Sequence, residues 1–212
     1  WKASESTWKA ASSVAEGRPT PTESAALPEW ERRLVIGADR AIYWMTSHWA
    51  LVFNSVFLLI VGLALASPLL CSAGLEGPGQ AIFRAYRVTC HQLPERSFFI
   101  DGYQVAFCQR DVGVQLGLFL GGVAYAASGG RIRLRNVAVY VLVFLVPVAL
   151  DGVTQLAGLR TSVWPLRLGT GLLFGVGTTL TAYPHFDKAM RDTRRELESR
   201  FGPGLARLRK RG

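Results

Sequence analysis

The fold is decided first by an apolar run at about residues 49–70, which reads WALVFNSVFLLIVGLALASPLL. A helix needs about 20 mostly apolar residues to cross the hydrocarbon core of a bilayer, and this run supplies that length. Three later segments qualify on the same ground, at about residues 112–128, 137–159 and 168–183. Four such segments in a chain of 212 residues leave too little polar sequence to bury them in a soluble protein. The sequence therefore predicts an all-α polytopic membrane protein, a bundle of four transmembrane helices.

The composition excludes several classes of protein. Half of the residues are hydrophobic, 18% are charged and the mean hydropathy is +0.22, which argues against a soluble globule and against disorder. The net charge of +9 would suggest a nucleic-acid partner in a soluble protein. Here the basic residues flank apolar spans, so the expected partner is a bilayer with anionic headgroups and not nucleic acid. Three cysteines without a Cys-x-x-Cys pair exclude zinc ribbons and thioredoxin-like sites.

The positions of Lys and Arg predict the orientation of the spans. The N-terminal tail, the loop between the second and third spans, and the C-terminal tail together hold 18 of the 24 Lys and Arg residues. Cytoplasmic segments carry the excess of positive charge, so both termini of this multi-pass protein are expected on the cytoplasmic side of the inner (cell) membrane. Residues 1–40 and 184–212 are then cytoplasmic tails, residues 41–183 form the transmembrane domain, and residues 71–111 form an ordered outward loop.

Glycines in the second and fourth spans recur every four residues. Gly113, Gly117 and Gly121 lie in the second span, and Gly171 and Gly175 lie in the fourth. Residues four apart share one face of a helix, and glycine on that face lets two backbones approach closely. These two spans are therefore predicted to be the inner helices of a tight bundle.

Polar residues at the outward ends of the spans predict a common site. Asp151 lies about 22 Å from the cytoplasmic end of its helix, at ~1.5 Å per residue, and therefore in the outer half of the hydrocarbon layer. An unpaired carboxylate there costs several kcal/mol, so Asp151 must be paired, protonated or in a wet cavity. The residues that follow it toward the same face are Gln155, Arg160, Ser162 and Arg167. The outward loop adds Cys90, His91, Arg96, Cys108, Arg110 and Asp111.

A family resemblance is carried by this loop and by the helix ends. The loop reads CHQLPERSF from Cys90 to Phe98, and Asp151-Gly152, Arg160, Ser162 and Arg167 follow downstream. Over about residues 45–183 the chain resembles a prokaryotic family of predicted integral membrane proteins of unknown function. The resemblance implies a membrane location and a shared polar site, and it implies no activity. In that family a second Cys often stands at the position of Asp111, so the Asp here weakens the case for a thiolate-rich metal site.

Three interpretations of the outward cysteines stay open. Cys90, His91, Cys108 and Asp111 supply thiolate, imidazole and carboxylate, which zinc accepts, so a divalent metal such as zinc is the cofactor that these residues could hold. A disulfide between Cys90 and Cys108 needs only proximity and the oxidising outer face. Free, buried and inert cysteines are the third interpretation.

The outer arginines and their neighbours allow two interpretations. The anion-binding candidates are Arg96, Arg110, Gln155, Arg160, Ser162 and Arg167. Guanidinium groups match the geometry of a phosphate oxyanion, and Asp151 and His91 are then the candidate catalytic groups, with Asp151 as a general base or proton carrier. The other interpretation is an internal ion-pair network, in which Arg160 or Arg167 neutralises Asp151 or Asp111.

Two hypotheses for function follow. The first is a membrane protein with its own outward-facing polar site, which binds a metal ion or an anionic lipid-like headgroup. The residue pattern leaves open whether such a protein is an enzyme. The second is a non-catalytic accessory subunit of a larger complex, which contacts other membrane subunits through its tails. Co-purification at fixed stoichiometry, lost when residues 1–40 or 184–212 are deleted, would distinguish the second hypothesis from the first.

Overall fold

The computed structural model describes residues 28–201. The chain divides into two compact units, Trp1–Trp44 and Met45–Gly212. Residues 1–27 and 202–212, which carry much of the two predicted tails, lie outside the described residues. The proposed contacts of these tails with other subunits therefore stay predictions.

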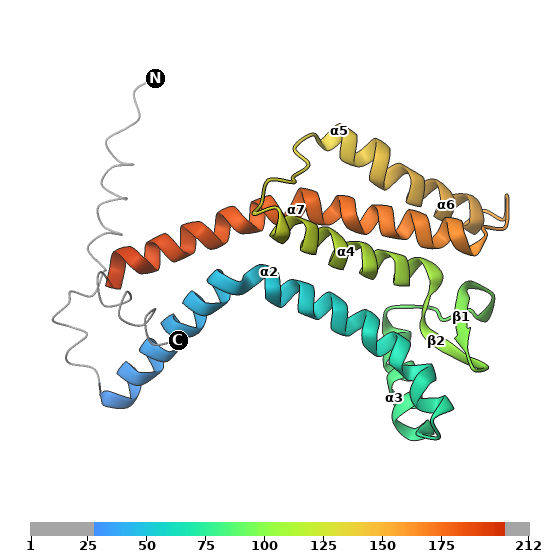
Figure 1. Ribbon diagram of the computed structural model, residues 1–212, viewed down its shortest axis with the longest axis horizontal. Coiled ribbons are helices and arrows are strands. Elements are labelled where there is room, and N and C mark those ends of the chain that lie inside the picture. The colour runs from blue at the N-terminus through green and yellow to red at the C-terminus, as the bar shows by residue number, and fades with distance from the viewer. Residues whose placement is uncertain (1–27, 202–212) are drawn as a thin grey trace, which may run out of the picture. The chain divides into compact units, whose positions relative to one another are not determined.

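The described residues are mostly helical, with one small antiparallel hairpin (Figure 1). The elements in chain order are α2 (Glu29–Ser72), α3 (Glu76–Ala85), the short 3₁₀ turns η1 (Tyr86–Val88) and η2 (Pro94–Arg96), the strands β1 (Ser97–Ile100) and β2 (Tyr103–Cys108), α4 (Gln109–Ala127), α5 (Val137–Val139), the π-helical segment η3 (Tyr140–Leu145), α6 (Val146–Leu156) and α7 (Trp164–Phe201). All four predicted spans are largely helical. The second extends one residue past the end of α4, and the third extends three residues past the end of α6.

Two of the described helical segments are long and apolar enough to cross a membrane. They are Glu29–Ser72 and Val137–Leu156. In Val137–Leu156 only 6% of the most apolar 18-residue stretch is buried inside the protein. Most of its apolar side chains are therefore on the protein surface, where lipid could contact them. Pro147 lies within this segment and has no backbone N–H, and the helix has π turns over Tyr140–Leu145, which end two residues before it. The length and composition of these two segments agree with a membrane protein.

The helices α4 and α7 lie side by side and touch along their glycines (Figure 1). A Cβ atom at Gly117 would overlap the carbonyl oxygen of Leu172 and come within 3.0 Å of the Cα of Gly175. A Cβ atom at Gly171 would likewise overlap the carbonyl oxygen of Arg110. The close packing predicted from the four-residue glycine spacing is confirmed. It also fixes the start of α4 beside the start of α7, where the polar residues lie.

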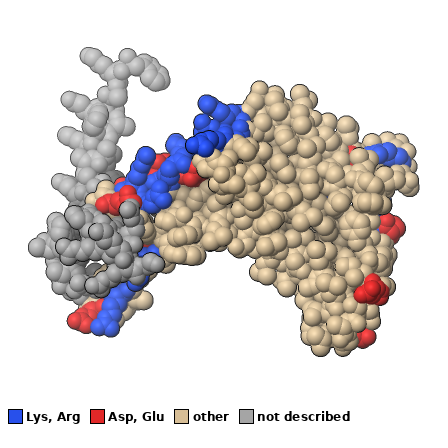
Figure 2. All heavy atoms as spheres, in the orientation of Figure 1, with Lys and Arg blue, Asp and Glu red and all other residues tan. Residues whose placement is uncertain are grey.

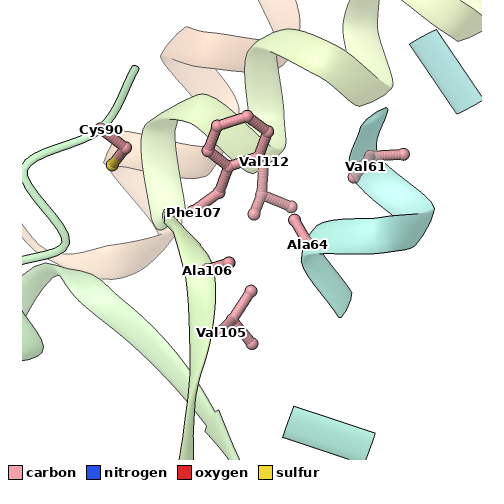
Figure 3. Close-up of a cluster of buried hydrophobic side chains, with 7 residues drawn as sticks. All are labelled: Val61, Ala64, Cys90, Val105, Ala106, Phe107 and Val112. Atoms are coloured by element: carbon pink, nitrogen blue, oxygen red, sulfur yellow. The ribbon is translucent and has the colours of Figure 1, made fainter. Parts of the chain in front are cut away.

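The loop at residues 71–111 is anchored on α2 by a buried apolar cluster. Val61 and Ala64 of α2 belong to the same cluster as Val105 and Phe107 of β2 and Val112 of α4 (Figure 3). Val61 is 2% exposed and Val105 is fully buried. Removal of these apolar groups from water stabilises the loop against the helices. The strand β2 therefore leads into α4 from a fixed position.

The hairpin itself was not part of the all-α prediction. The strands β1 and β2 pair antiparallel, with Ile100 opposite Tyr103. The two residues between them, Asp101 and Gly102, have φ angles of 49° and 82°. Both angles lie in the left-handed region. Type I′ turns, whose backbone twist matches that of the two strands, require such angles at both central residues. The predicted loop at residues 71–111 thus contains a helix, two 3₁₀ turns and a hairpin, followed by the first turn of α4.

Candidate functional site

The Cys-His-Gln segment is held in place by the side chain of Gln92. Its Nε2 donates hydrogen bonds to the carbonyl oxygens of Phe83, at 2.6 Å, and Ala106, at 3.0 Å. The carbonyl oxygen of Gln92 accepts a hydrogen bond from Nε2 of Gln104 at 2.7 Å. These bonds tie the loop to α3 and β2. The thiol of Cys90, two residues earlier, therefore has a defined position beside the hairpin.

Cys90, Cys108 and Asp111 form one cluster at the N-terminus of α4. The Sγ of Cys108 caps this helix, because it accepts the backbone N–H of Asp111 at 3.5 Å. The thiol of Cys108 donates to Oδ2 of Asp111 at 3.2 Å, and the Sγ of Cys90 accepts the backbone N–H of Cys108 at 3.3 Å. One ligand atom from each residue lies within 4.8 Å of the other two. The structure thus brings together three of the four residues predicted to bind a metal or form a disulfide.

The two thiols of this cluster differ in acidity. The hydrogen bond with the Cys108 thiol lowers the pKa of Cys90. The same hydrogen bond, followed by burial and the negative charge of Asp111, raises the pKa of Cys108. Cys90 is therefore the more acidic thiol of the pair, and Cys108 retains its proton.

All three cysteines are free thiols in the structure. Cys71 is buried at the end of α2 and is not a member of the cluster. His91, the fourth predicted ligand, is exposed and also lies outside the cluster, although it lines the neighbouring cavity. A disulfide between Cys90 and Cys108 stays a prediction, as does a metal ion in this cluster.

Asp151 is 1% exposed, and both of its carboxylate oxygens accept hydrogen bonds. Oδ1 accepts from Nη2 of Arg160 and from the hydroxyl of Ser162, each at 2.7 Å. Oδ2 accepts from Nη2 of Arg110, which also approaches Oε1 of Gln155 at 3.5 Å. This geometry supports the ion-pair network more than a catalytic carboxylate. Asp151 also does not line the cavity that His91 faces, so the two candidate catalytic residues do not share it.

Three arginines line one cavity of about 430 Å³, called here the arginine cavity. They are Arg96 from the end of η2, Arg110 from α4 and Arg167 from α7. Nη1 of Arg167 donates to the carbonyl oxygen of Glu95 and to Oε1 of Gln109, each at 3.0 Å. The Nε atom of each of the three arginines is buried and has no hydrogen-bond partner in the described part of the chain.

Positive charge is in excess around the arginine cavity. Arg110 and Arg160 form ion pairs with Asp151, whereas none of the ion pairs among residues 28–201 includes Arg96 or Arg167. The remaining acid on the cavity wall is Asp111, which accepts the Cys108 thiol. Buried guanidinium N–H groups without acceptors are costly. An oxyanion in this cavity would supply negative charge beside Arg96 and Arg167, which have no carboxylate partner among the described residues.

A second cavity of about 330 Å³ adjoins the first and is called here the apolar cavity. It is lined by Ile60, Ala85, Tyr86, Thr89, Phe107, Asp111, Val114 and Gln115. Thr89 and Asp111 line both cavities, so a polar space and a mostly apolar space meet at these two residues.

Sequence comparison identifies relatives of this chain. Residues 90–181 match the family model described as predicted membrane protein, DUF2085. An uncharacterised protein of Methanocaldococcus jannaschii is 36% identical over 107 residues, which cover 50% of this chain and 68% of the relative. An uncharacterised protein of Methanothermobacter thermautotrophicus is 38% identical over 95 residues, which cover 43% of this chain and 82% of that relative. The chain belongs to the DUF2085 family.

No solved structure matches this DUF2085 protein. The family match begins at Cys90 and ends within α7, so it contains the cysteine cluster, the Asp151 network and all three arginines of the cavity. The apolar helix α2 lies outside the matched residues. The predicted resemblance to a family of membrane proteins of unknown function is confirmed over residues 90–181, a shorter stretch than the predicted 45–183. The family is described as predicted membrane proteins, and no activity comes with it.

Two residues of this DUF2085 site, Gln109 and Thr89, were not among those predicted from the sequence. Gln109 bridges two elements, because its Nε2 donates to the carbonyl oxygen of Ser97 at 3.1 Å while its Oε1 accepts from Arg167. Thr89 lies between the two cavities. The sequence did contain an indication for Gln109, which stands beside Arg110 at the start of an apolar helix. A side-chain amide that is buried there is expected to form hydrogen bonds. Thr89 gives no comparable signal.

Proposed function

We propose that this DUF2085 protein binds the anionic headgroup of an amphiphile in the arginine cavity, on the outward face of the membrane. The observation that carries the proposal is the wall of this cavity, where Arg96, Arg110 and Arg167 stand together with Asp111 as the one acid among the described lining residues. A phosphate-type oxyanion offers several acceptors at once, and guanidinium groups match its geometry. Arg96 and Arg167 also lack a carboxylate partner in the described residues, so a bound anion would meet uncompensated positive charge.

The apolar cavity supports an amphiphile over a free anion. Ile60, Phe107 and Val114 give this cavity a mostly apolar wall, and Thr89 and Asp111 connect it with the arginine cavity. An acyl chain attached to a headgroup among the arginines could therefore enter apolar surroundings directly. Burial of its methylene groups contributes roughly 0.8 kcal/mol each, which favours a lipid over inorganic phosphate.

The proposal places this site at the outward end of a four-span bundle. In the unit Met45–Gly212, Lys and Arg gather over the C-terminal half of α7, and the drawn face between them and the hairpin is largely uncharged (Figure 2). The glycine contacts make α4 and α7 a pair that would cross the bilayer together, with α2 and the Val137–Leu156 segment as the apolar spans. The excess of positive charge at the α7 end supports a cytoplasmic position for that end.

The headgroup proposal is tested on the full chain, purified in detergent and stripped of lipid. Phosphatidylglycerol, phosphatidylcholine or inorganic phosphate is added back, and the intact mass under gentle conditions reports the bound molecule. We expect one phosphatidylglycerol per chain and weaker binding of phosphatidylcholine, because the arginines repel the choline cation. Arg96→Gln is expected to weaken phosphatidylglycerol binding about tenfold, the lower end of the ~1.5–3 kcal/mol that hydrogen bonds to charged groups contribute.

The matched control for Arg96→Gln is Arg87→Gln. Arg87 is exposed on the same outward loop and lines neither cavity, so this variant loses the same charge without changing the site. We expect it to bind phosphatidylglycerol like the wild type. Equal weakening by both variants would mean that general surface charge attracts the lipid, and it would contradict a specific site.

A second variant separates the lipid from the free anion. Ala85→Phe is expected to fill the apolar cavity, because Ala85 lines it, while Ala81→Phe adds the same ring one turn earlier on α3, outside both cavities. Ala85→Phe should lower the affinity for phosphatidylglycerol and leave the affinity for inorganic phosphate unchanged. If both affinities are unchanged, the acyl chain does not occupy this cavity.

A further inference from the structure

We infer that Cys90, Cys108 and Asp111 form a three-ligand site for a soft divalent cation of the zinc class, with a fourth position open to the arginine cavity. Two thiolates and one carboxylate are a donor set that zinc accepts. All three residues line the arginine cavity, so the remaining coordination position faces a space that water or an anion can enter. Three protein ligands and one open position are typical of zinc sites that act on a ligand, whereas structural zinc sites are closed.

The geometry of the cluster needs little rearrangement to bind an ion. The three ligand atoms lie within 4.8 Å of one another. Bond lengths of ~2.3 Å to sulfur and ~2.0–2.2 Å to oxygen in a tetrahedron place such atoms roughly 3.6–3.8 Å apart. The ligands would therefore move together by about 1 Å, which changes of side-chain rotamer can supply. Cys108 and Asp111 are three residues apart at the start of α4 and share one face of its first turn.

The position of the cluster is fixed by its surroundings. The Gln92 amide bonds hold the Cys90 loop against β2, and β2 continues directly into the turn that carries Cys108 and Asp111. Metal ligands that are already positioned bind with a smaller loss of conformational entropy. Cys71, by contrast, lies outside the cluster and serves as an internal reference thiol.

The charges balance when the ion binds. The Cys108 thiol donates a hydrogen bond to Asp111, and a bound ion would replace the thiol proton between these two groups. Binding of one divalent cation releases the two thiol protons and leaves the ligand set with a single net negative charge. Arg110 and Arg167 line the same cavity and can compensate that charge. This inference does not depend on lipid binding, because the metal ligands do not include the arginines.

The test uses the full chain in detergent, kept reduced, freed of metal with a chelator and titrated with Co²⁺ and then Zn²⁺. We expect one Co²⁺ per chain with the absorption of tetrahedral thiolate coordination, and its displacement by Zn²⁺. Cys90→Ser and Cys108→Ser should each weaken Zn²⁺ binding by more than the ~10- to 100-fold that loss of an outer-sphere partner costs. Cys71→Ser, the matched control, should bind like the wild type.

Asp111→Asn keeps both thiolates and guards against a folding defect in the serine variants. It should retain the thiolate absorption of bound Co²⁺ but with altered bands and weaker affinity, because an amide oxygen replaces a carboxylate. Absence of thiolate absorption in the reduced wild type would overturn the inference. Unchanged Zn²⁺ affinity in both Cys90→Ser and Cys108→Ser would overturn it as well. Phosphatidylglycerol binding is measured on the same preparations. Loss of the metal site and loss of the headgroup site can therefore be told apart.

Discussion

Asp151 connects three parts of the polypeptide through one carboxylate. It belongs to α6, and its partners are Arg110 at the start of α4 and Arg160 and Ser162 in the connection to α7. A buried carboxylate is stable only when its oxygens are paired, and here each oxygen accepts at least one hydrogen bond. We interpret Asp151 as the residue that holds the start of α4, the end of α6 and the connection to α7 together. It lies outside the lining of the arginine cavity.

Asp151→Asn is expected to destabilise the protein by about 3 kcal/mol, because it leaves Arg110 and Arg160 without their counter-charge. The thermal unfolding midpoint in detergent, followed by circular dichroism, measures the change. Asp101→Asn is the matched control, since Asp101 is exposed at the hairpin turn and Asn tolerates its left-handed backbone. Wild-type stability in Asp151→Asn would contradict the structural role.

The sequence predicts that Asp151 must be paired but does not identify all of its partners. Arg160 lies nearby in the chain, and the pairing with it was among the expected ion pairs. Arg110 is 41 residues away, and its approach depends on how the outward loop leads into α4. Arg167, the other expected partner, instead holds the carbonyl oxygen of Glu95. Contacts between distant residues of this kind follow from the packing of the helices, which hydropathy does not determine.

At the scale of elements, the pair α4 and α7 organises the site. Their glycine faces bring the two backbones into direct contact, and the arginines at their starting ends therefore line one cavity. This pairing could be predicted from the sequence, because glycines four residues apart mark one helix face. Arg110 and Arg167 thus line the same cavity because the backbones of α4 and α7 approach closely at these glycines.

Gly117→Ala is expected to destabilise the protein by about 1–3 kcal/mol, the usual cost of overpacking, because its Cβ would overlap the carbonyl oxygen of Leu172. The measurement is again thermal unfolding in detergent. Gly169→Ala is the matched control on α7, since a Cβ there meets no atom within 4 Å. It should be neutral or slightly stabilising, because Ala favours helix over Gly. Equal stability of the two variants would contradict the tight contact.

The hairpin could have been predicted, because its turn has a recognisable signal. Asp101-Gly102 stands between Phe98-Phe99-Ile100 and Tyr103, and Asp-Gly between apolar residues is a strong hairpin indication. The register is not equally predictable, because it shifts between Ser97 and Phe99. The position of β2 on α2 is not predictable either, because the buried cluster there joins residues more than forty positions apart. The apolar cavity depends on the same long-range packing and left no pattern in the sequence.

At the scale of the whole molecule, the proposed four spans require the outward loop and the loop at residues 131–136 to lie on opposite sides of the membrane. Glu76→Cys and Arg133→Cys place new thiols at exposed positions in these two regions. A membrane-impermeant maleimide applied to intact cells should label the Glu76→Cys protein and leave the Arg133→Cys protein unlabelled until the membrane is opened. Labelling of the wild type, whose own cysteines are buried or half-buried, gives the background.

The opposite labelling pattern would invert the orientation and place the arginine cavity in the cytoplasm. Labelling of both positions in intact cells would contradict a second span that crosses the bilayer, because this span alone separates residues 76 and 133. Both variants must first show the wild-type unfolding midpoint, so that the labelling reports topology and not unfolded protein.

The most direct test of the central claim is photocrosslinking with a phosphatidylglycerol that carries a diazirine in its acyl chain. Peptide mass spectrometry then locates the attached lipid. We expect the label to concentrate on segments lining the apolar cavity, around Tyr86, Phe107 and Val114, and we expect Arg96→Gln but not Arg87→Gln to reduce it there. A label spread evenly over the exposed apolar faces of α2 and α6, unchanged in Arg96→Gln, would contradict the claim that these two cavities hold an anionic amphiphile.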